Sequence, residues 1–220
     1  RSKMQELIRV AVDAMGGDNA PAEIVKGAVE ALEASTDLKV ILVGQEEAVQ
    51  QELSKYQYDA SRMEVVNATE IIEMAEPPVQ AIRSKKDSSI VVAMKLVKNG
   101  EADAFVGAGS TGAVLVGGQL IVGRLKGVER PPLAPLLPTE KGASLLIDCG
   151  ANVDARPSHL VQFAKMGSIY MENVMGVKNP RVAIVNIGAE EEKGNALVKE
   201  TFPLLKACQD INFIGSIEAR

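Results

Sequence analysis

The densest group of chemistry-bearing residues is the segment Val10–Asp18, where an apolar run ends at Asp13 and continues through Gly16 and Gly17 to Asp18. Glycines at a strand-to-helix junction let backbone N–H groups approach a ligand, and the N-terminus of the following helix favours an anion. The two carboxylates would repel an anion, so they suit holding the loop, positioning a polar ligand or binding a cation. We interpret this segment as one wall of a ligand crevice, with Asp13 and Asp18 organising it.

A second loop, Gly107–Gly112, follows an apolar run and matches the pattern G-x-G-x-x-G. A dinucleotide fingerprint lies after the first strand of its fold and is followed about 20 residues later by an acid at a strand end. Here the acid near that distance, Glu129, lies in a proline-containing segment. We prefer an anion-binding turn whose backbone N–H groups, with Ser110 and Thr111, hold a phosphate or an oxyanion. Tight packing and a helix cap are the alternative for each glycine.

Two later loops also carry polar side chains after an apolar run. Asp148, Asn152 and Asp154 lie in the first, and Asn186–Asn195 with its Lys193 forms the second. Turn and cap roles are the alternative for Asn152 and Asp154, and a solvated acidic turn is the alternative for the second loop. Because the carboxyl ends of parallel strands converge on one ligand crevice, the several loops together favour a small-molecule site more strongly than any one of them.

Residues that could act as a covalent nucleophile are few. His159 is the only histidine, no G-x-S-x-G elbow presents a serine, and the position of His159 beside Ser158 at a helix start favours capping or packing. Cys149 follows Asp148, which disfavours its thiolate. Direct attack by a bound anionic substrate therefore fits better than a covalent enzyme intermediate.

Two basic clusters interrupt the acidic background, one at Arg83–Lys86 and one running from Arg124 to Arg130. They could recruit an acidic protein or hold phosphate. Solvated helix ends are the alternative, because surface Lys and Arg residues are common.

The elements that must position these loops are short apolar runs alternating with helical patterns. Wholly apolar runs predict strands buried on both faces, and the alternation predicts a mostly parallel α/β sheet with right-handed crossovers. The first expected helix carries Ile24, Val25, Ala28 and Leu32 at helical spacing, and another follows Pro157. The expected strands are 8–12, 40–43, 104–106, 145–147, 182–185 and 213–214.

One segment breaks the alternation. The runs 133–138 and 143–148 are joined by Glu140–Gly142 with no room for a helix, which predicts a hairpin arm over 131–148. Pro131, Pro132, Pro135 and Pro138 restrict its first strand to an edge or an irregular arm. We expect residues 1–220 to form a single α/β domain.

Composition narrows the function classes. The chain has 220 residues, of which 46% are hydrophobic and 24% charged, as in soluble globular proteins. A net charge of −5 argues against binding of nucleic acid. Two cysteines form neither a disulfide framework nor a metal-ligand cluster, and no signal peptide or membrane span is visible. These features predict a cytoplasmic enzyme without a metal.

Five motifs together resemble the bacterial phosphate acyltransferases of phospholipid synthesis, the PlsX family. They are VDAMGGDNAP at 12–21, GAGSTGA at 107–113, RPPLAPLLPT at 130–139, LIDCGANVDARPSHL at 146–160 and NIGAEEEKGN at 186–195. The chain departs from the family's more frequent Ser-Ala-Gly-Asn-Thr-Gly-Ala at Gly107 and Ser110. Family members continue well past Arg220, so the resemblance implies that this chain is the N-terminal two-thirds of a longer protein.

The resemblance implies transfer of a long-chain acyl group from acyl carrier protein to inorganic phosphate. The acyl phosphate then serves the membrane-bound glycerol-3-phosphate acyltransferase of glycerophospholipid synthesis. It further implies a three-layer α/β/α sandwich like that of isocitrate and isopropylmalate dehydrogenases, a homodimer, no cofactor, and a cytoplasmic location with peripheral membrane association left open.

On this basis the candidate residues fall into three groups. The catalytic candidates are Lys193, Asp13 and Asn152. The candidates for binding substrate or phosphate are Gly16, Gly17, Asp18, Gly109, Ser110, Thr111, Gly112, Asp148, Asn186, Gly188 and Asn195. The candidates for docking the carrier protein are Arg83, Lys85, Lys86, Arg124 and Lys126.

Two other classes of protein stay open. A decarboxylating dehydrogenase that uses NAD(P) and a metal would share the fold class and the G-x-G-x-x-G match. A non-catalytic scaffold would bind carrier protein without phosphate-dependent turnover.

Overall fold

The computed structural model describes residues 7–218, which form two compact units, one ending at Arg124 and the other beginning at Leu125. Most contacts of each unit are made within that unit, and the single domain expected over residues 1–220 stays a prediction. The first unit contains β1 (Ile8–Asp13), α1 (Ala22–Ala34), β2 (Leu38–Gly44), α2 (Glu46–Leu53), the 3-10 turn η1 (Ala60–Arg62), β3 (Met63–Asn67), α3 (Pro78–Ser84), α4 (Ser89–Lys98), β4 (Ala104–Val106), α5 (Thr111–Gly117) and the π-helical turn η2 (Gly118–Val122).

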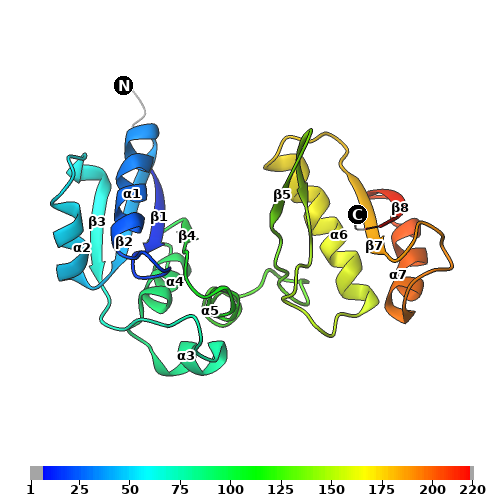
Figure 1. The fold of residues 1–220 in the computed structure, drawn as a ribbon, viewed down its shortest axis with the longest axis horizontal. Coiled ribbons are helices and arrows are strands. Elements are labelled where there is room, and N and C mark those ends of the chain that lie inside the picture. The colour runs from blue at the N-terminus through cyan, green and yellow to red at the C-terminus, as the bar shows by residue number, and fades with distance from the viewer. Residues whose placement is uncertain (1–6, 219–220) are drawn as a thin grey trace. The chain divides into compact units, whose positions relative to one another are not determined.

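The first unit is built on a parallel sheet with the strand order β3-β2-β1-β4. In Figure 1, β1 is blue, β3 is cyan and β4 is green. Successive side chains of a strand point to opposite faces. Val40 and Leu42 of β2 accordingly pack in a cluster with α1 and α2, whereas Ile41 and Val43 pack in a cluster with Ala93 of α4. Helices therefore cover both faces of this sheet, which explains why residues 40–43 of β2 are all apolar.

Helix α1 has the amphipathic pattern that the sequence predicts. Its buried residues Val25, Ala28, Val29 and Leu32 recur at helical spacing and pack against β2 and α2. Helix α4 begins with a cap, because the Ser88 hydroxyl accepts a hydrogen bond from the Val91 N–H at 3.4 Å.

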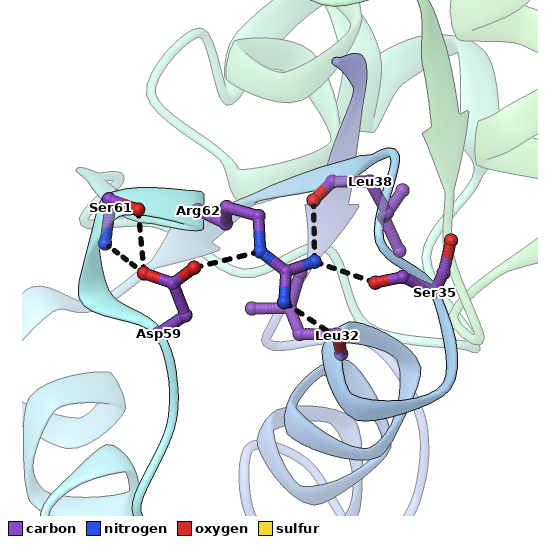
Figure 2. Close-up of polar contacts among 6 residues, drawn as sticks. All are labelled: Leu32, Ser35, Leu38, Asp59, Ser61 and Arg62. Atoms are coloured by element: carbon purple, nitrogen blue, oxygen red, sulfur yellow. Dashed lines mark hydrogen bonds and ion pairs between the residues drawn. The ribbon is translucent and has the colours of Figure 1, made fainter. Parts of the chain in front are cut away.

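Arg62 connects η1 to the C-terminal end of α1 (Figure 2). Its guanidinium donates to the backbone oxygens of Leu32 at 2.9 Å and Ser35 at 2.6 Å, and to that of Leu38 at 3.3 Å. The last carbonyls of a helix have no partner within the helix, so Arg62 satisfies groups that the backbone leaves open. Asp59 holds Arg62 through Nε at 3.0 Å.

The second unit contains a hairpin and a two-stranded parallel sheet (Figure 1). Its elements are β5 (Leu136–Thr139), β6 (Gly142–Leu145), α6 (Pro157–Asn173), β7 (Arg181–Asn186), α7 (Ala196–Ala207) and β8 (Asn212–Glu218). Strands β5 and β6 pair antiparallel, which confirms the predicted hairpin. Helices α6 and α7 pack on the β7–β8 sheet around Ala164, Ile184, Phe202 and Leu205.

Two expectations about the strands were wrong. The first was that these strands are buried on both faces. In β4, Val106 is 55% exposed. In β7 and β8, the paired residues Val185 and Ile217 are each 46% exposed. Strand β4 lies at the edge of its sheet. The expected strand 145–147 also fails, because β6 ends at Leu145.

Within residues 7–218, no helix combines the length and the apolar character needed to cross a membrane.

Candidate functional site

Two glycine-containing loops of the first unit meet at the carboxyl ends of β1 and β4. In the sheet, β2 lies on one side of β1 and β4 lies on the other. The strand order therefore reverses between β1 and β4. Ligands of open α/β sheets bind in the crevice at such a switch point. The loops approach so closely that a Cβ atom at Gly16 would lie 2.9 Å from the Gly109 N atom, and one at Gly109 would lie 3.2 Å from the Gly16 Cα atom. A side chain at Gly16 would therefore clash with the facing backbone, and one at Gly109 would require that backbone to move by a few tenths of an ångström.

The Asp13 carboxyl lies between the two loops and is 1% exposed. Its Oδ1 atom accepts the Met15 N–H at 3.0 Å, and a Cβ atom placed on Gly16 would lie 2.4 Å from its Oδ2 atom. Burial raises the pKa of Asp13, while hydrogen bonds from the Ser89 hydroxyl and from the Met15 and Gly16 amides oppose that rise. Asp13 thus holds the start of the loop after β1, and its role in the reaction stays a prediction.

The raised pKa of Asp13 predicts a specific dependence of stability on pH. The folded state holds the proton more tightly than the unfolded state, whose Asp titrates near the ordinary value of 3.8. The contribution of Asp13 is therefore most favourable below 3.8, falls as pH rises towards the folded pKa, and is constant above it. Urea unfolding of the wild type and Asp13→Asn across this range should show the wild type losing stability relative to the variant. If the stability of the wild type relative to Asp13→Asn instead increases with pH, the pKa of Asp13 is not raised in the folded state.

The remaining candidates in the loop after β4 have mainly local roles. Ser110 is 4% exposed, and its hydroxyl accepts the Ala113 N–H at 3.2 Å as the cap of α5. A Cβ atom at Gly112 would lie 2.6 Å from the Pro78 Cγ atom, so this glycine permits packing of α3 on α5. Thr111 is exposed.

The glycine pair after β1 has two different roles. Gly17 has a φ of 103°, which residues with a side chain rarely adopt. Gly16 is needed because the loop after β4 approaches its Cα atom closely. Asp18 is exposed at the mouth of the same loop. Its carboxylate therefore lies in solvent, unlike that of Asp13.

In the second unit, Asp148 organises the loop after the hairpin. Its Oδ1 atom accepts the N–H groups of Leu133 at 2.7 Å and Ala151 at 3.3 Å, and its Oδ2 atom accepts the Asn152 N–H at 2.8 Å. The Asn152 side chain donates to the Pro131 oxygen at 3.1 Å. Both side chains are thus engaged in joining the two ends of the hairpin arm.

The loop after β7 is held by its two asparagines. Asn186 is buried, donates to the Lys193 oxygen at 2.9 Å and accepts the Ile187 N–H, and Asn195 caps α7 by accepting the Val198 N–H at 3.0 Å. The half-exposed Lys193 ammonium pairs with Glu190 at 3.0 Å. Gly188 is buried beneath this ion pair, since a Cβ atom there would lie 2.5 Å from the Lys193 Cδ atom.

The structure therefore forms two separate groups of candidates. Asp13, Gly16, Gly109 and Ser110 lie together in the first unit, while Asp148 with Asn152, and Asn186 with Lys193, lie in the second. That the two groups share one crevice stays a prediction.

The basic residues of the first unit differ in how strongly they are engaged. Lys85 donates to the Ile71 oxygen at 2.6 Å and pairs with Glu76, so its charge holds the 71–76 segment. Lys86 and Arg83 are exposed. Arg124 and Lys126, the candidates on either side of the unit boundary, are also exposed.

Lys95 and Lys98 are two basic residues that the sequence analysis missed. The Lys95 ammonium donates to the Lys86 oxygen at 3.3 Å, and that of Lys98 donates to the Val122 oxygen at 3.1 Å. Their spacing of three residues on a helix was the signal that could have placed them on one face. They extend the exposed basic surface from Lys86 along α4.

Ser89 is a further buried residue outside the predicted candidates, and its hydroxyl opposes the rise in the pKa of Asp13. The sequence places it beside the capping serine without distinguishing the two.

A hollow of about 600 Å³ lies beside the ends of β2 and β3. Its lining includes Glu46 and Glu47, whose carboxylates would repel a phosphate. Within residues 7–218, no three His, Cys, Asp or Glu side chains are grouped as a metal site would need.

The comparisons with known proteins agree with this architecture. The model of the family described as fatty acid synthesis protein matches residues 8–220. The phosphate acyltransferase of Desulfitobacterium hafniense strain Y51 is 55% identical over 214 residues, and that of Clostridium perfringens strain ATCC 13124 is 53% identical over 213. Each alignment covers 97% of this chain and 63% of the relative, so the chain spans less than two-thirds of the length of these curated relatives.

Two solved structures have a similar fold at low sequence identity. A phosphotransacetylase from Streptococcus pyogenes superposes with a TM-score of 0.71 at 19% identity and covers 96% of this chain and 68% of its own. The EutD phosphotransacetylase from Staphylococcus aureus has a TM-score of 0.67 at 20% identity, covering 96% and 69%. The fold is therefore a phosphotransacetylase-like α/β fold with mostly parallel strands. The match over 8–220 and the identity to named relatives show that the chain belongs to the fatty acid synthesis protein family, the PlsX family.

Proposed function

We propose that this chain belongs to a phosphate acyltransferase that transfers a long-chain acyl group from acyl carrier protein to inorganic phosphate. The observation that carries the proposal is the identity of 53–55% to relatives named phosphate acyltransferases over 97% of the chain. The glycine-lined switch point at Asp13 supports it, because such a crevice admits an anion close to backbone N–H groups. The product acyl phosphate would feed glycerophospholipid synthesis through the membrane glycerol-3-phosphate acyltransferase.

The reaction needs no covalent intermediate on the protein. An oxygen of bound hydrogen phosphate attacks the thioester carbonyl and forms a C–O bond, the C–S bond breaks, and the phosphate proton passes to the departing carrier thiolate. Backbone N–H groups near Gly16, Gly17 and Gly109 would stabilise the tetrahedral oxyanion. Holding the two reactants in contact supplies the rate enhancement that a covalent intermediate would otherwise give.

In this scheme Lys193 neutralises the phosphate. Its present partner is Glu190, in an ion pair whose two side chains are about half exposed. Exposed ion pairs contribute little to stability, so a phosphate dianion can replace the Glu190 carboxylate as partner. Asn152 and Asp148 would hold the loop after the hairpin or form hydrogen bonds with the substrate.

The dehydrogenase alternative is less well supported. The strand order β3-β2-β1-β4 also occurs in dinucleotide-binding sheets, but their fingerprint follows the first strand. In this chain the G-x-G-x-x-G match follows β4, and the loop after β1 begins with the buried Asp13.

The test uses the chain itself and a chimera in which it is joined to the remaining segment of the Desulfitobacterium hafniense relative. Each is incubated with palmitoyl-carrier protein, with and without phosphate, while acyl phosphate and free carrier thiol are measured. We expect phosphate-dependent formation of both products. A folded chimera that is inactive where the intact relative turns over, or thiol release without phosphate, would contradict the proposal. Nucleotide-dependent absorbance changes would favour the dehydrogenase, and carrier binding without turnover would favour a scaffold.

We further propose that the acidic carrier protein docks on the exposed basic residues of the first unit. The surface joins Lys95 and Lys98 to Arg83, Lys86 and Arg124 of the predicted patch. It leaves out Lys85, because Glu76 neutralises it, and Lys126, because that residue belongs to the second unit. A positive surface attracts an acidic partner at low ionic strength despite the net charge of −5.

Charge reversal tests this docking surface. The double substitution Lys95→Glu/Lys98→Glu should weaken carrier binding about 10-fold at low salt, and the difference should shrink as salt screens the charges. Lys178→Glu/Lys199→Glu changes the net charge equally on the second unit and serves as the control. Equal affinities of the two double variants, measured by calorimetry, would reject the surface.

The remaining parts of the proposal come from the family. They are a three-layer sandwich like that of isocitrate and isopropylmalate dehydrogenases, a homodimer, a cytoplasmic location with peripheral membrane association, and no bound cofactor.

A further inference from the structure

The parallel sheet of the second unit is covered by helices on one face. Val182 and Ile184 of β7 pack in a cluster with α6 and α7. Successive side chains of a strand point to opposite faces, so Val185 lies on the other face, and it is paired in register with Ile217 of β8. Both are 46% exposed, and Ile187, two residues after Val185, is 80% exposed. We call Val185, Ile187 and Ile217 the open face.

An open apolar face is unusual for a sheet of this kind. Parallel sheets occur almost only where both faces are covered, because the connections between parallel strands pack helices on them. The sheet of β7 and β8 is parallel and contains no other strand among residues 7–218. Grouped apolar side chains on a surface are typical of a site that another segment or protein covers. We therefore expect a further element to pack on the open face.

The length of the relatives indicates which element this is. The alignments with the phosphate acyltransferases cover 97% of this chain but 63% of each relative, and the resemblance implies that the remaining segment follows Arg220. Strand β8 runs to Glu218, so that segment starts at the sheet itself. A connection from a strand to a further parallel strand passes over a face of the sheet, usually as a helix. One face is already occupied by α6 and α7, which leaves the open face.

We propose that the open face is the docking surface for the segment that follows Arg220 in the relatives, and that apolar side chains of this segment bury Val185 and Ile217. The inference concerns the folding of the longer protein and does not rest on the proposed reaction. It also bears on a predicted site, because Val185 directly precedes the buried Asn186, which donates to the Lys193 oxygen at 2.9 Å. The docked segment therefore lies beside the loop after β7.

Thiol labelling measures the cover directly. Val185→Cys and Ile217→Cys are each made in the chain and in the chimera with the remaining segment of the Desulfitobacterium hafniense relative. Mass spectrometry distinguishes maleimide labelling at these positions from labelling of Cys149 and Cys208. Both variants should label about 100-fold more slowly in the chimera, because a covered thiol reacts only in locally opened molecules. The control is Leu204→Cys on α7, where the native side chain is 47% exposed, and it should label at the same rate in both proteins.

A charged substitution tests the same face through stability. In the chain alone, Val185→Asp places a carboxylate where solvent reaches it, so the midpoint of thermal unfolding should change little. In the chimera the same carboxylate would be buried without a partner, which should lower the midpoint by about 5 °C or more. Leu204→Asp, at a position of equal exposure, should shift the midpoints of the two proteins alike. The intact relative, substituted at the aligned positions, gives the same comparison without a chimera.

Each other outcome assigns the open face differently and overturns the proposal. Rapid labelling at Val185 and Ile217 in the chimera and in the intact relative would show that the remaining segment packs elsewhere. Slow labelling in the dilute chain alone would show that the first unit covers the face. Slow labelling that appears only as the chain is concentrated would assign the face to a second copy. Because labelling needs no substrate, an inactive chimera with a protected face would contradict the proposed function and support this inference.

Discussion

Replacing Gly16 by alanine is expected to lower phosphate-dependent turnover about 100-fold, as misplacement of reacting groups by about 1 Å does. The added methyl group would lie 2.4 Å from the Asp13 Oδ2 atom and 2.9 Å from the Gly109 N atom. The Gly109 N atom and the Gly109 Cα atom, at 3.0 Å, are backbone atoms of the facing loop, which cannot rotate away as the end of a long side chain can. The loops after β1 and β4 must therefore separate, and overpacking of this kind also costs about 2 kcal/mol of stability.

The matched control is Gly27→Ala. Gly27 lies on the exposed side of α1, and a Cβ atom there would meet nothing within 4 Å. This change should raise stability by about 0.5–1 kcal/mol, because alanine favours the helix more than glycine does. Both variants are assayed in the chimera well below their unfolding temperatures. Turnover of Gly16→Ala within twofold of the wild type would show that the approach of the two loops is unimportant for function.

Replacing Arg62 by alanine is expected to cost about 3 kcal/mol of folding free energy, because hydrogen bonds from a charged donor contribute about 1.5–3 kcal/mol each and are not additive. The Arg62 side chain is 18% exposed, and its guanidinium donates to the oxygens of Leu32, Ser35 and Leu38 (Figure 2). Truncation leaves three carbonyls at the end of α1 and the start of β2 without this donor. Urea denaturation measures the loss.

Two further substitutions identify the cause. Arg62→Lys keeps the charge but places it on a single nitrogen, which cannot span carbonyls on both sides as the fork does, so most of the loss should remain. Arg9→Ala removes an arginine that pairs with the exposed Asp103 at 2.9 Å, and exposed pairs contribute little. If Arg9→Ala lowers the folding free energy as much as Arg62→Ala does, the hydrogen bonds from Arg62 to the end of α1 do not account for the loss.

Much of the fold could be predicted from hydrophobic patterning. The runs 40–43 and 182–185 lie within β2 and β7, and the Glu140–Gly142 turn forms the hairpin. The pattern failed where it was taken as a measure of burial on both faces. Val106 and Val185 are apolar but lie on an edge strand and on the uncovered face of a two-stranded sheet, respectively. The apolar composition of a strand indicates that the strand tends to be buried. Which of its faces are covered depends on its position in the sheet and on the helices that pack there.

At the candidate site, the sequence could not predict which of two adjacent residues of the same type makes a given contact. Lys85 and Lys86 are equivalent in the sequence, yet only Lys85 is paired with an acid in the structure, Glu76. Ser88 and Ser89 are likewise equivalent, yet Ser88 is the residue that caps α4. These differences depend on which segments fold against each residue, which local patterns do not encode. The catalytic, phosphate-binding and carrier-docking assignments themselves remain predictions.

The division of the chain into two compact units also determines how its unfolding can be observed. The protein has no tryptophan and three tyrosines, of which Tyr56 and Tyr58 pack against the core of α1 and α2, while Tyr170 lies on α6 at 39% exposure. Tyrosine fluorescence therefore reports mainly on the first unit. Units with separate cores need not unfold together, so a single midpoint from one optical probe does not describe the whole chain, and calorimetry or far-ultraviolet dichroism must accompany it.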